Sequence, residues 1–163
     1  MIKTLEAIDS NLILTEYNRL EKDIVWLEAG NKKQSSLQYR LGEDIWLSAT
    51  GKQNSNEKEY TELNPLYNGT IFEEIINKYK LIRARFMWVS PHTCYSMHQD
   101  NSPRIHVPII TNSECYFVFK KGIVQHMPAG SVYYTDTRHF HTFMNCSSEH
   151  RLHLIGAVEY GSI

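Results

Sequence analysis

The spacing of apolar residues along the chain changes near residue 80. Before that point, two segments repeat apolar side chains at the three- and four-residue intervals of one helix face. The first, residues 9–22, begins behind a possible cap at Asp9. The second, residues 70–80, begins with Thr70 followed by Glu73, the pattern of a capping box. We therefore expect two amphipathic helices in the first half of the chain.

Beyond residue 80 the pattern changes to short apolar runs separated by turn residues. Such runs, at intervals of roughly ten residues, are typical of an all-β barrel or jelly roll and not of alternating strands and helices. Two earlier β-prone runs cover residues 23–29 and 44–49, and residues 30–36 and 51–65 are expected to form loops. The strands expected after residue 80 are 81–89, 93–97, 104–110, 114–119, 122–126, 131–136, 140–144 and 151–159.

The chain length and this pattern together predict one domain. At 163 residues the chain has the size of a single domain, because division into several domains becomes usual only beyond about 250 residues. We expect residues 1–80 to provide mostly helical and loop support and residues 81–163 to form the β-barrel core. The predicted fold is mainly β, with N-terminal helices packed on one face.

Composition and charge exclude several classes of protein. Hydrophobic residues make up 42% of the chain and charged residues 21%, which is typical of globular proteins and unlike disordered, collagenous or coiled-coil chains. With 17 basic and 18 acidic side chains, no net field attracts nucleic acid or an anionic membrane. We find neither a signal peptide nor a membrane span, and three widely spaced cysteines suggest no disulfide framework. A cytoplasmic location is therefore expected.

Histidine is distributed unevenly, since all eight histidines follow residue 91. His98 and Asp100 are two positions apart, so on an extended strand both side chains point to the same side. His141 follows on another expected strand. Two imidazoles and one carboxylate form a facial set that leaves coordination positions open, as in non-haem Fe(II) oxygenases. The three residues are therefore candidate metal ligands, although an isolated His-x-Asp is a weak signal.

Two groups of basic residues accompany this candidate metal set. Arg151 lies ten residues beyond His141 inside an apolar run, where an unpaired guanidinium would be costly to bury. A carboxylate held by two parallel hydrogen bonds would compensate that charge. Arg104 and His106 share one face of an expected strand and would suit a second carboxylate.

Plainer interpretations of these basic residues also exist. Arg151 could pair with a structural acid such as Asp136 or Glu159. His106 could be a hydrogen-bonded interior histidine.

The segment from about residue 83 to residue 158 resembles the aspartyl/asparaginyl β-hydroxylase family of Fe(II)- and 2-oxoglutarate-dependent dioxygenases, which includes relatives that hydroxylate free proline. The resemblance implies a double-stranded β-helix of the jelly-roll, cupin-like type, with Fe(II), 2-oxoglutarate and O2 as metal, cosubstrate and oxidant. The stretches that carry it occur in order, at residues 97–100, 104–112, 127–134, 136–145 and 151–155.

The resemblance also implies roles for individual residues. The family's distal metal ligand stands four residues before an asparagine, which favours His141 over His139. Arg151 would bind the C5 carboxylate of 2-oxoglutarate, and Arg104 and His106 would contact carboxylates of the cosubstrate or substrate. Together with the metal ligands His98, Asp100 and His141, Arg151 would complete the catalytic set.

Two departures from the family pattern affect this interpretation. Some β-hydroxylases lack the metal-binding carboxylate, whereas Asp100 is present here, as in the proline hydroxylases. A serine that assists the C5 carboxylate would align near Met87, which cannot donate a hydrogen bond, so the second partner of that carboxylate is unassigned.

The predicted reaction is hydroxylation of an unactivated C–H in an amino acid, or in an Asp, Asn or Pro side chain of a peptide, with release of succinate and CO2. We expect a substrate that carries a carboxylate. The alternative is a metal-binding cupin-type isomerase or a non-catalytic small-molecule binding domain, because β-barrels with histidine clusters serve several functions. The sequence does not indicate the oligomeric state.

Overall fold

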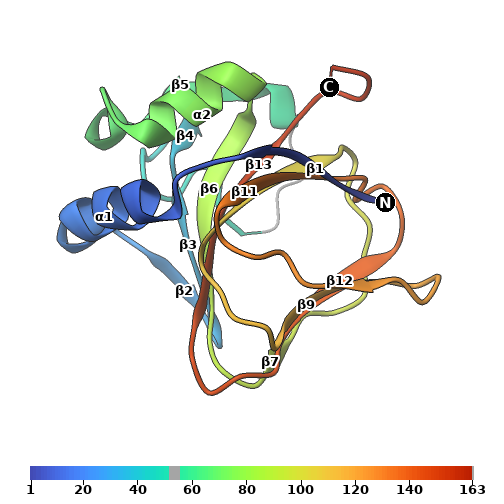
Figure 1. The fold of residues 1–163 in the computed structure, drawn as a ribbon. Coiled ribbons are helices and arrows are strands. Elements are labelled where there is room, and N and C mark those ends of the chain that lie inside the picture. The colour runs from blue at the N-terminus through green and yellow to red at the C-terminus, as the bar shows by residue number, and fades with distance from the viewer. Residues whose placement is uncertain (52–55, 163) are drawn as a thin grey trace.

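The computed structural model describes residues 1–51 and 56–162. Its largest element is an antiparallel sheet of seven strands (Figure 1). Most neighbouring strands in this sheet come from distant parts of the chain, and the last two at one edge form a hairpin. In spatial order the strands are β1 (Ile2–Ala7), β11 (Ser131–Thr135), β8 (Arg104–Ile110), β13 (Arg151–Ala157), β6 (Ile82–Val89), β3 (Lys32–Ser36) and β2 (Leu27–Ala29).

A second antiparallel sheet faces the first and closes the barrel (Figure 1). Apolar side chains from the two inner faces form a small core that includes Phe117, Phe143 and Ile155. The mainly β, jelly-roll architecture predicted from the sequence is thereby confirmed. The strands of the second sheet are, in order, β10 (Val124–Gln125), β9 (Cys115–Phe119), β12 (His141–Asn145) and β7 (Thr93–Cys94).

Both predicted helices are present, and they pack on the outer face of the large sheet (Figure 1). In α1 (Ser10–Leu20) the Asp9 carboxylate caps the first turn by accepting from two backbone amides. In α2 (Ile71–Tyr79) the hydroxyl of Thr70 accepts from the amide of Glu73. The larger hydrophobic core lies between these helices and the outer face of the sheet.

The first 80 residues contain more strand than the sequence predicted. Residues 30–36, expected to form a loop, contain β3, which pairs with β6 and forms a hairpin with β2. The interval 51–65, also expected to be a loop, contains η2 (Glu57–Glu59) and β5 (Tyr60–Leu63), while its residues 52–55 lie outside the described residues. β5 pairs with β4 (Gln38–Arg40), and a further short helix is η3 (Pro65–Tyr67). Residues 1–80 therefore contribute three strands to the large sheet in addition to the expected helices and loops.

The reverse error occurs at residues 44–49, where a strand was expected and turns are found. The Asp44 carboxylate accepts hydrogen bonds from the amides of Trp46 and Leu47, at 2.8 and 2.9 Å. These bonds stabilise a turn, so the segment does not adopt the strand conformation that its apolar residues favour. In the run 23–29, η1 (Glu21–Asp23) ends inside the expected strand, and only the last three residues form β2.

Among the helices of the described residues, none combines the length and the apolar character that crossing a bilayer requires. The cysteines Cys94, Cys115 and Cys146 are free thiols.

Candidate metal centre and active-site cavity

His98 and His141 lie side by side although they are far apart in the sequence. His141 is the first residue of β12, and His98 lies in the segment after β7. The two residues form an isolated antiparallel bridge, in which His98 N donates to His141 O at 2.9 Å and His141 N donates to His98 O at 2.7 Å. The backbone therefore fixes both imidazoles side by side, with ring centroids 4.3 Å apart.

Hydrogen bonds to the backbone set the tautomer of both rings. Nδ1 of His98 lies 2.7 Å from the carbonyl oxygen of Ser96, and Nδ1 of His141 lies 2.9 Å from that of His139. Because a carbonyl oxygen can only accept, Nδ1 is the protonated nitrogen of each ring, and Nε2 keeps a free lone pair. Burial lowers the pKa of His141 and favours the neutral form that metals require.

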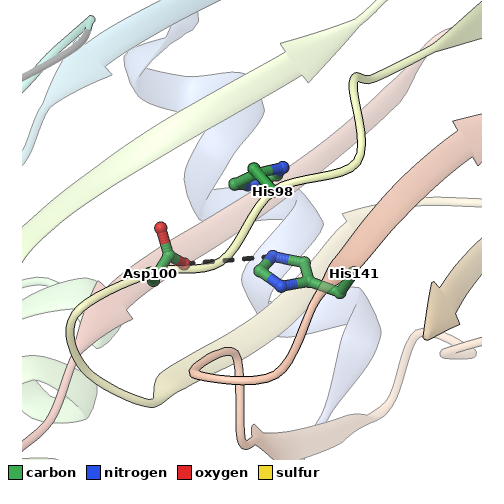
Figure 2. Close-up of side chains that lie close together, drawn as sticks. All are labelled: His98, Asp100 and His141. Atoms are coloured by element: carbon green, nitrogen blue, oxygen red, sulfur yellow. Dashed lines mark ion pairs between the residues drawn. The ribbon is translucent and has the colours of Figure 1, made fainter. Parts of the chain in front are cut away.

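Asp100 brings a carboxylate to the same point. Its amide donates to the carbonyl oxygen of Thr137 at 2.9 Å, and its Oδ2 lies 3.9 Å from Nε2 of His141. One ligand atom from each of His98, Asp100 and His141 lies within 4.8 Å of the others, and the three side chains converge in Figure 2. Two neutral imidazoles and a carboxylate are the donor set that suits a non-haem Fe(II) site, so these residues fit such an ion.

The three candidate ligands line a cavity of about 400 Å³ between the two sheets. This volume lies within the range of small-molecule sites. His106 also lines the cavity, and neither of its ring nitrogens has a hydrogen-bond partner among the described residues. Burial, reinforced by nearby arginines, holds the pKa of His106 well below its usual value, so its ring is neutral.

The structure places Arg104 in the same cavity but gives it partners of its own. Its guanidinium donates to both carboxylate oxygens of Glu57, at 2.7 and 3.1 Å, and its Nε lies 3.2 Å from Oδ2 of Asp100. The contact with Asp100 is an ion pair and not a hydrogen bond, and it holds a positive charge beside the ligand carboxylate, where outer partners of metal ligands commonly lie. They favour a positioning role for Arg104 over direct contact with a carboxylate of the cosubstrate.

Arg151 is buried and is not one of the residues that line the cavity. Its guanidinium lies 5.1 Å from the ring of Phe143, which does line the cavity. Nη2 contacts Nδ1 of His153 at 2.9 Å, whereas Nη1 has no hydrogen-bond partner among the described residues. Burial lowers the pKa of Arg151 to about 10, which leaves it charged at neutral pH.

The two acidic residues considered as partners of Arg151, Asp136 and Glu159, form ion pairs with other residues. Asp136 pairs with Arg138 at 2.8 Å, and Glu159 pairs with Lys58 at 2.6 Å. The charge of Arg151 is therefore not neutralised by either carboxylate.

Sequence reasoning missed the group of charges that surrounds the cavity. Glu57 bridges Arg83, at 2.8 Å, and Arg104, at 2.7 Å. Burial alone would raise the pKa of Glu57, but the adjacent arginines lower it to about 2. No local pattern marks Glu57, because it belongs to a polar stretch expected to be a loop.

Arg85 was also missed, although the sequence contains a signal for it. It lines the cavity from β6 and is almost completely buried. Like Arg151, it is a charged residue within a largely apolar run, which here also contains Arg83, and its burial is costly unless an anion compensates it.

Comparisons with known proteins show the family of the chain and the fold that it shares. The family model described as Aspartyl/Asparaginyl beta-hydroxylase matches residues 9–160, nearly the whole chain. A search of curated proteins found no significant match.

Solved structures share the fold at low sequence identity. A 2OG-Fe(II) oxygenase family oxidoreductase from Burkholderia pseudomallei has a TM-score of 0.63 at 15% identity, over 96% of this chain and 82% of that one. HygX from Streptomyces hygroscopicus, solved with nickel, 2-oxoglutarate and hygromycin B bound, gives 0.56 at 8% identity, over 98% and 83%. A Pseudomonas putida prolyl-4-hydroxylase gives 0.54 at 11% identity, over 98% and 91%. At these identities the likeness shows the fold.

Proposed function

Because the chain belongs to the aspartyl/asparaginyl β-hydroxylase family, it is a 2-oxoglutarate-dependent dioxygenase, and we propose that it hydroxylates an unactivated C–H of an amino acid or of an Asp, Asn or Pro side chain in a peptide. The observation that carries the proposal is the convergence of His98, Asp100 and His141 at the wall of the cavity. The reaction consumes O2 and 2-oxoglutarate and releases succinate and CO2.

His98, Asp100 and His141 would hold Fe(II), the two histidines through Nε2. When bound, the iron and 2-oxoglutarate supply the oxidising chemistry that an unactivated C–H requires. The protein orients the ligands before any ion arrives, since backbone carbonyls fix both rings and Arg104 contacts the Asp100 carboxylate. This orientation reduces the rearrangement that metal binding needs.

Arg151 and His106 are proposed to bind the cosubstrate. The free Nη1 of Arg151 would donate to the C5 carboxylate of 2-oxoglutarate, a charge-assisted hydrogen bond that fixes the position of the keto acid. His106 lies in the cavity as a neutral ring with two free nitrogens, so it can donate one hydrogen bond to a carboxylate oxygen of 2-oxoglutarate. Arg104, predicted to share this role, is proposed to act on Asp100 instead.

The charges around the cavity support a substrate that carries a carboxylate. Three arginines and two carboxylates line it among the described residues, and a divalent ion adds further positive charge. An anionic substrate would reduce this excess. We also propose a cytoplasmic location, for which three free thiols suit a reducing compartment.

Succinate formation tests the proposal. Wild-type protein with Fe(II), 2-oxoglutarate and O2 is assayed with a panel of free amino acids and of Asp-, Asn- and Pro-containing peptides, beside the Arg151→Gln variant. We expect succinate from the wild type, stimulated by at least one panel member, and little from the variant. Metal binding without any turnover of 2-oxoglutarate would instead favour the cupin-type isomerase or the non-catalytic binding domain.

A further inference from the structure

Arg85 is a buried cation that faces the cavity without a carboxylate of its own. It lies near the middle of the large sheet, where β6 pairs with β13 on one side and with β3 on the other, and its register partners are Ile155 and Ser36. Nη1 donates to the carbonyl oxygen of Arg83 at 3.3 Å, and Nε has no hydrogen-bond partner among the described residues. Burial, with the neighbouring arginines, lowers the pKa of Arg85 to about 9, so it is charged at neutral pH.

The two carboxylates that line the cavity among the described residues form ion pairs with residues other than Arg85. Glu57 is held by Arg83 and Arg104, and Asp100 faces the candidate metal position and Arg104. A buried charge without a counter-charge is strongly destabilising, so a cation retained in this state points to an anion that arrives with a ligand.

This inference rests on the proposed function, in which both carboxylates of 2-oxoglutarate are bound by other groups than Arg85. The C1 carboxylate belongs at the metal and the C5 carboxylate at Arg151. Arg85 lines the same cavity as the candidate metal ligands. An anion that binds to Arg85 in addition to the two carboxylates of 2-oxoglutarate would therefore belong to the primary substrate. We propose that Arg85 binds a carboxylate of the primary substrate and thereby selects substrates that carry one.

The test separates substrate binding from cosubstrate binding. The variants are Arg85→Gln, which removes the charge, and Arg85→Lys, which keeps it, with Arg19→Gln as a control on the exposed side of α1. First, 2-oxoglutarate is titrated anaerobically into each Fe(II)-loaded protein, and the Kd is read from the charge-transfer absorption band. We expect Arg85→Gln to match the wild type within about twofold, whereas Arg151→Gln binds at least about tenfold more weakly, the usual effect of losing a charged hydrogen bond.

Second, L-proline, L-aspartate, L-asparagine and short peptides that contain these residues are each compared with the carboxamide of the same compound. Stimulated succinate formation is measured, and anaerobic calorimetry with 2-oxoglutarate bound measures binding directly. We expect the wild type to prefer at least one acid over its amide, and Arg85→Gln to reduce that preference by roughly 10- to 100-fold. Arg85→Lys should restore part of it, and Arg19→Gln should leave it unchanged.

A third measurement distinguishes a binding residue from a structural one. Since an uncompensated buried charge destabilises the fold, Arg85→Met should raise the Tm of the protein without ligand or leave it unchanged. A large fall in Tm would indicate a structural role and overturn the proposal.

The other outcomes are also decisive. Loss of 2-oxoglutarate binding in Arg85→Gln would make Arg85 a cosubstrate residue, and equal use of acids and amides by the wild type would exclude carboxylate selection. Either result overturns this inference and leaves the proposed function standing. If the wild type itself shows no 2-oxoglutarate-dependent absorption band, the proposed function fails.

Discussion

Arg104 Nε lies 3.2 Å from Oδ2 of Asp100, so a buried guanidinium contacts one of the three proposed iron ligands. We expect Arg104→Gln to weaken metal binding by about 10- to 100-fold, because partners of this kind hold a ligand carboxylate in its binding orientation. The Kd for Co(II), which resists oxidation better than Fe(II), gives the measurement. Arg138→Gln, which removes a pair with Asp136 outside the cavity lining, is the control, and equal metal affinity in wild type and Arg104→Gln would contradict the assigned role.

Glu57 provides the second prediction, because its carboxylate neutralises Arg83 and Arg104 together. Glu57→Gln leaves two buried guanidinium groups without that charge, and we expect a loss of about 3 kcal/mol in the free energy of unfolding. Glu59→Gln, two residues away, removes an exposed pair with Arg40 and should cost no more than about 1 kcal/mol. Urea denaturation measures both. Equal effects of the two substitutions would show that the buried network does not stabilise the fold.

The same residue predicts a pH dependence of stability. The pKa of Glu57 is lowered from 4.5 to about 2 in the folded protein. A lowered carboxyl pKa contributes stability that is fully present above about pH 4.5 and is lost as the pH falls towards 2. The difference in unfolding free energy between wild type and Glu57→Gln should therefore narrow over this window, by roughly 3 kcal/mol in all. A difference that is constant from neutral to acid pH would contradict the lowered pKa.

Asn145, the last residue of β12, gives a further prediction. Its buried amide donates to the carbonyl oxygens of Val89, Ser90 and Glu149, between 2.7 and 3.2 Å, and so holds the turn that leads into β13. Asn145→Ala removes this donor from three carbonyl oxygens, of which that of Glu149 keeps the Ser147 hydroxyl at 3.0 Å, and we expect a loss of about 3 kcal/mol in stability. Asn112→Ala removes a donor to the Ser147 hydroxyl of this turn and the acceptor of the Glu114 amide, and it should cost about 1 kcal/mol. Thermal unfolding compares the two, and a smaller effect at Asn145 would contradict this account.

The candidate metal set could be predicted from the sequence because its geometry is largely local. His98 and Asp100 are separated by one residue, and His141 starts a strand of its own. The third ligand is brought close by the backbone bridge between His98 and His141, which follows from the barrel topology that regular strand spacing indicated.

The elements that the sequence did not reveal depend on distant partners. The polar residues of β3 predict a loop. Their strand conformation comes from pairing with β6, more than 40 residues away. Glu57 also lies in a polar stretch, and its importance comes from two arginines on other strands. Arg85 differs, since its burial follows from the apolar run around it.

The central claim is that this cavity binds Fe(II) and 2-oxoglutarate together through the three converging side chains. The most direct measurement is the visible absorption spectrum of the anaerobic protein during addition of Fe(II) and then 2-oxoglutarate. We expect a charge-transfer band that needs both components, is absent from His98→Ala and His141→Ala, and saturates at one 2-oxoglutarate per chain. No band in the wild type, or an identical band in the histidine variants, would contradict the claim.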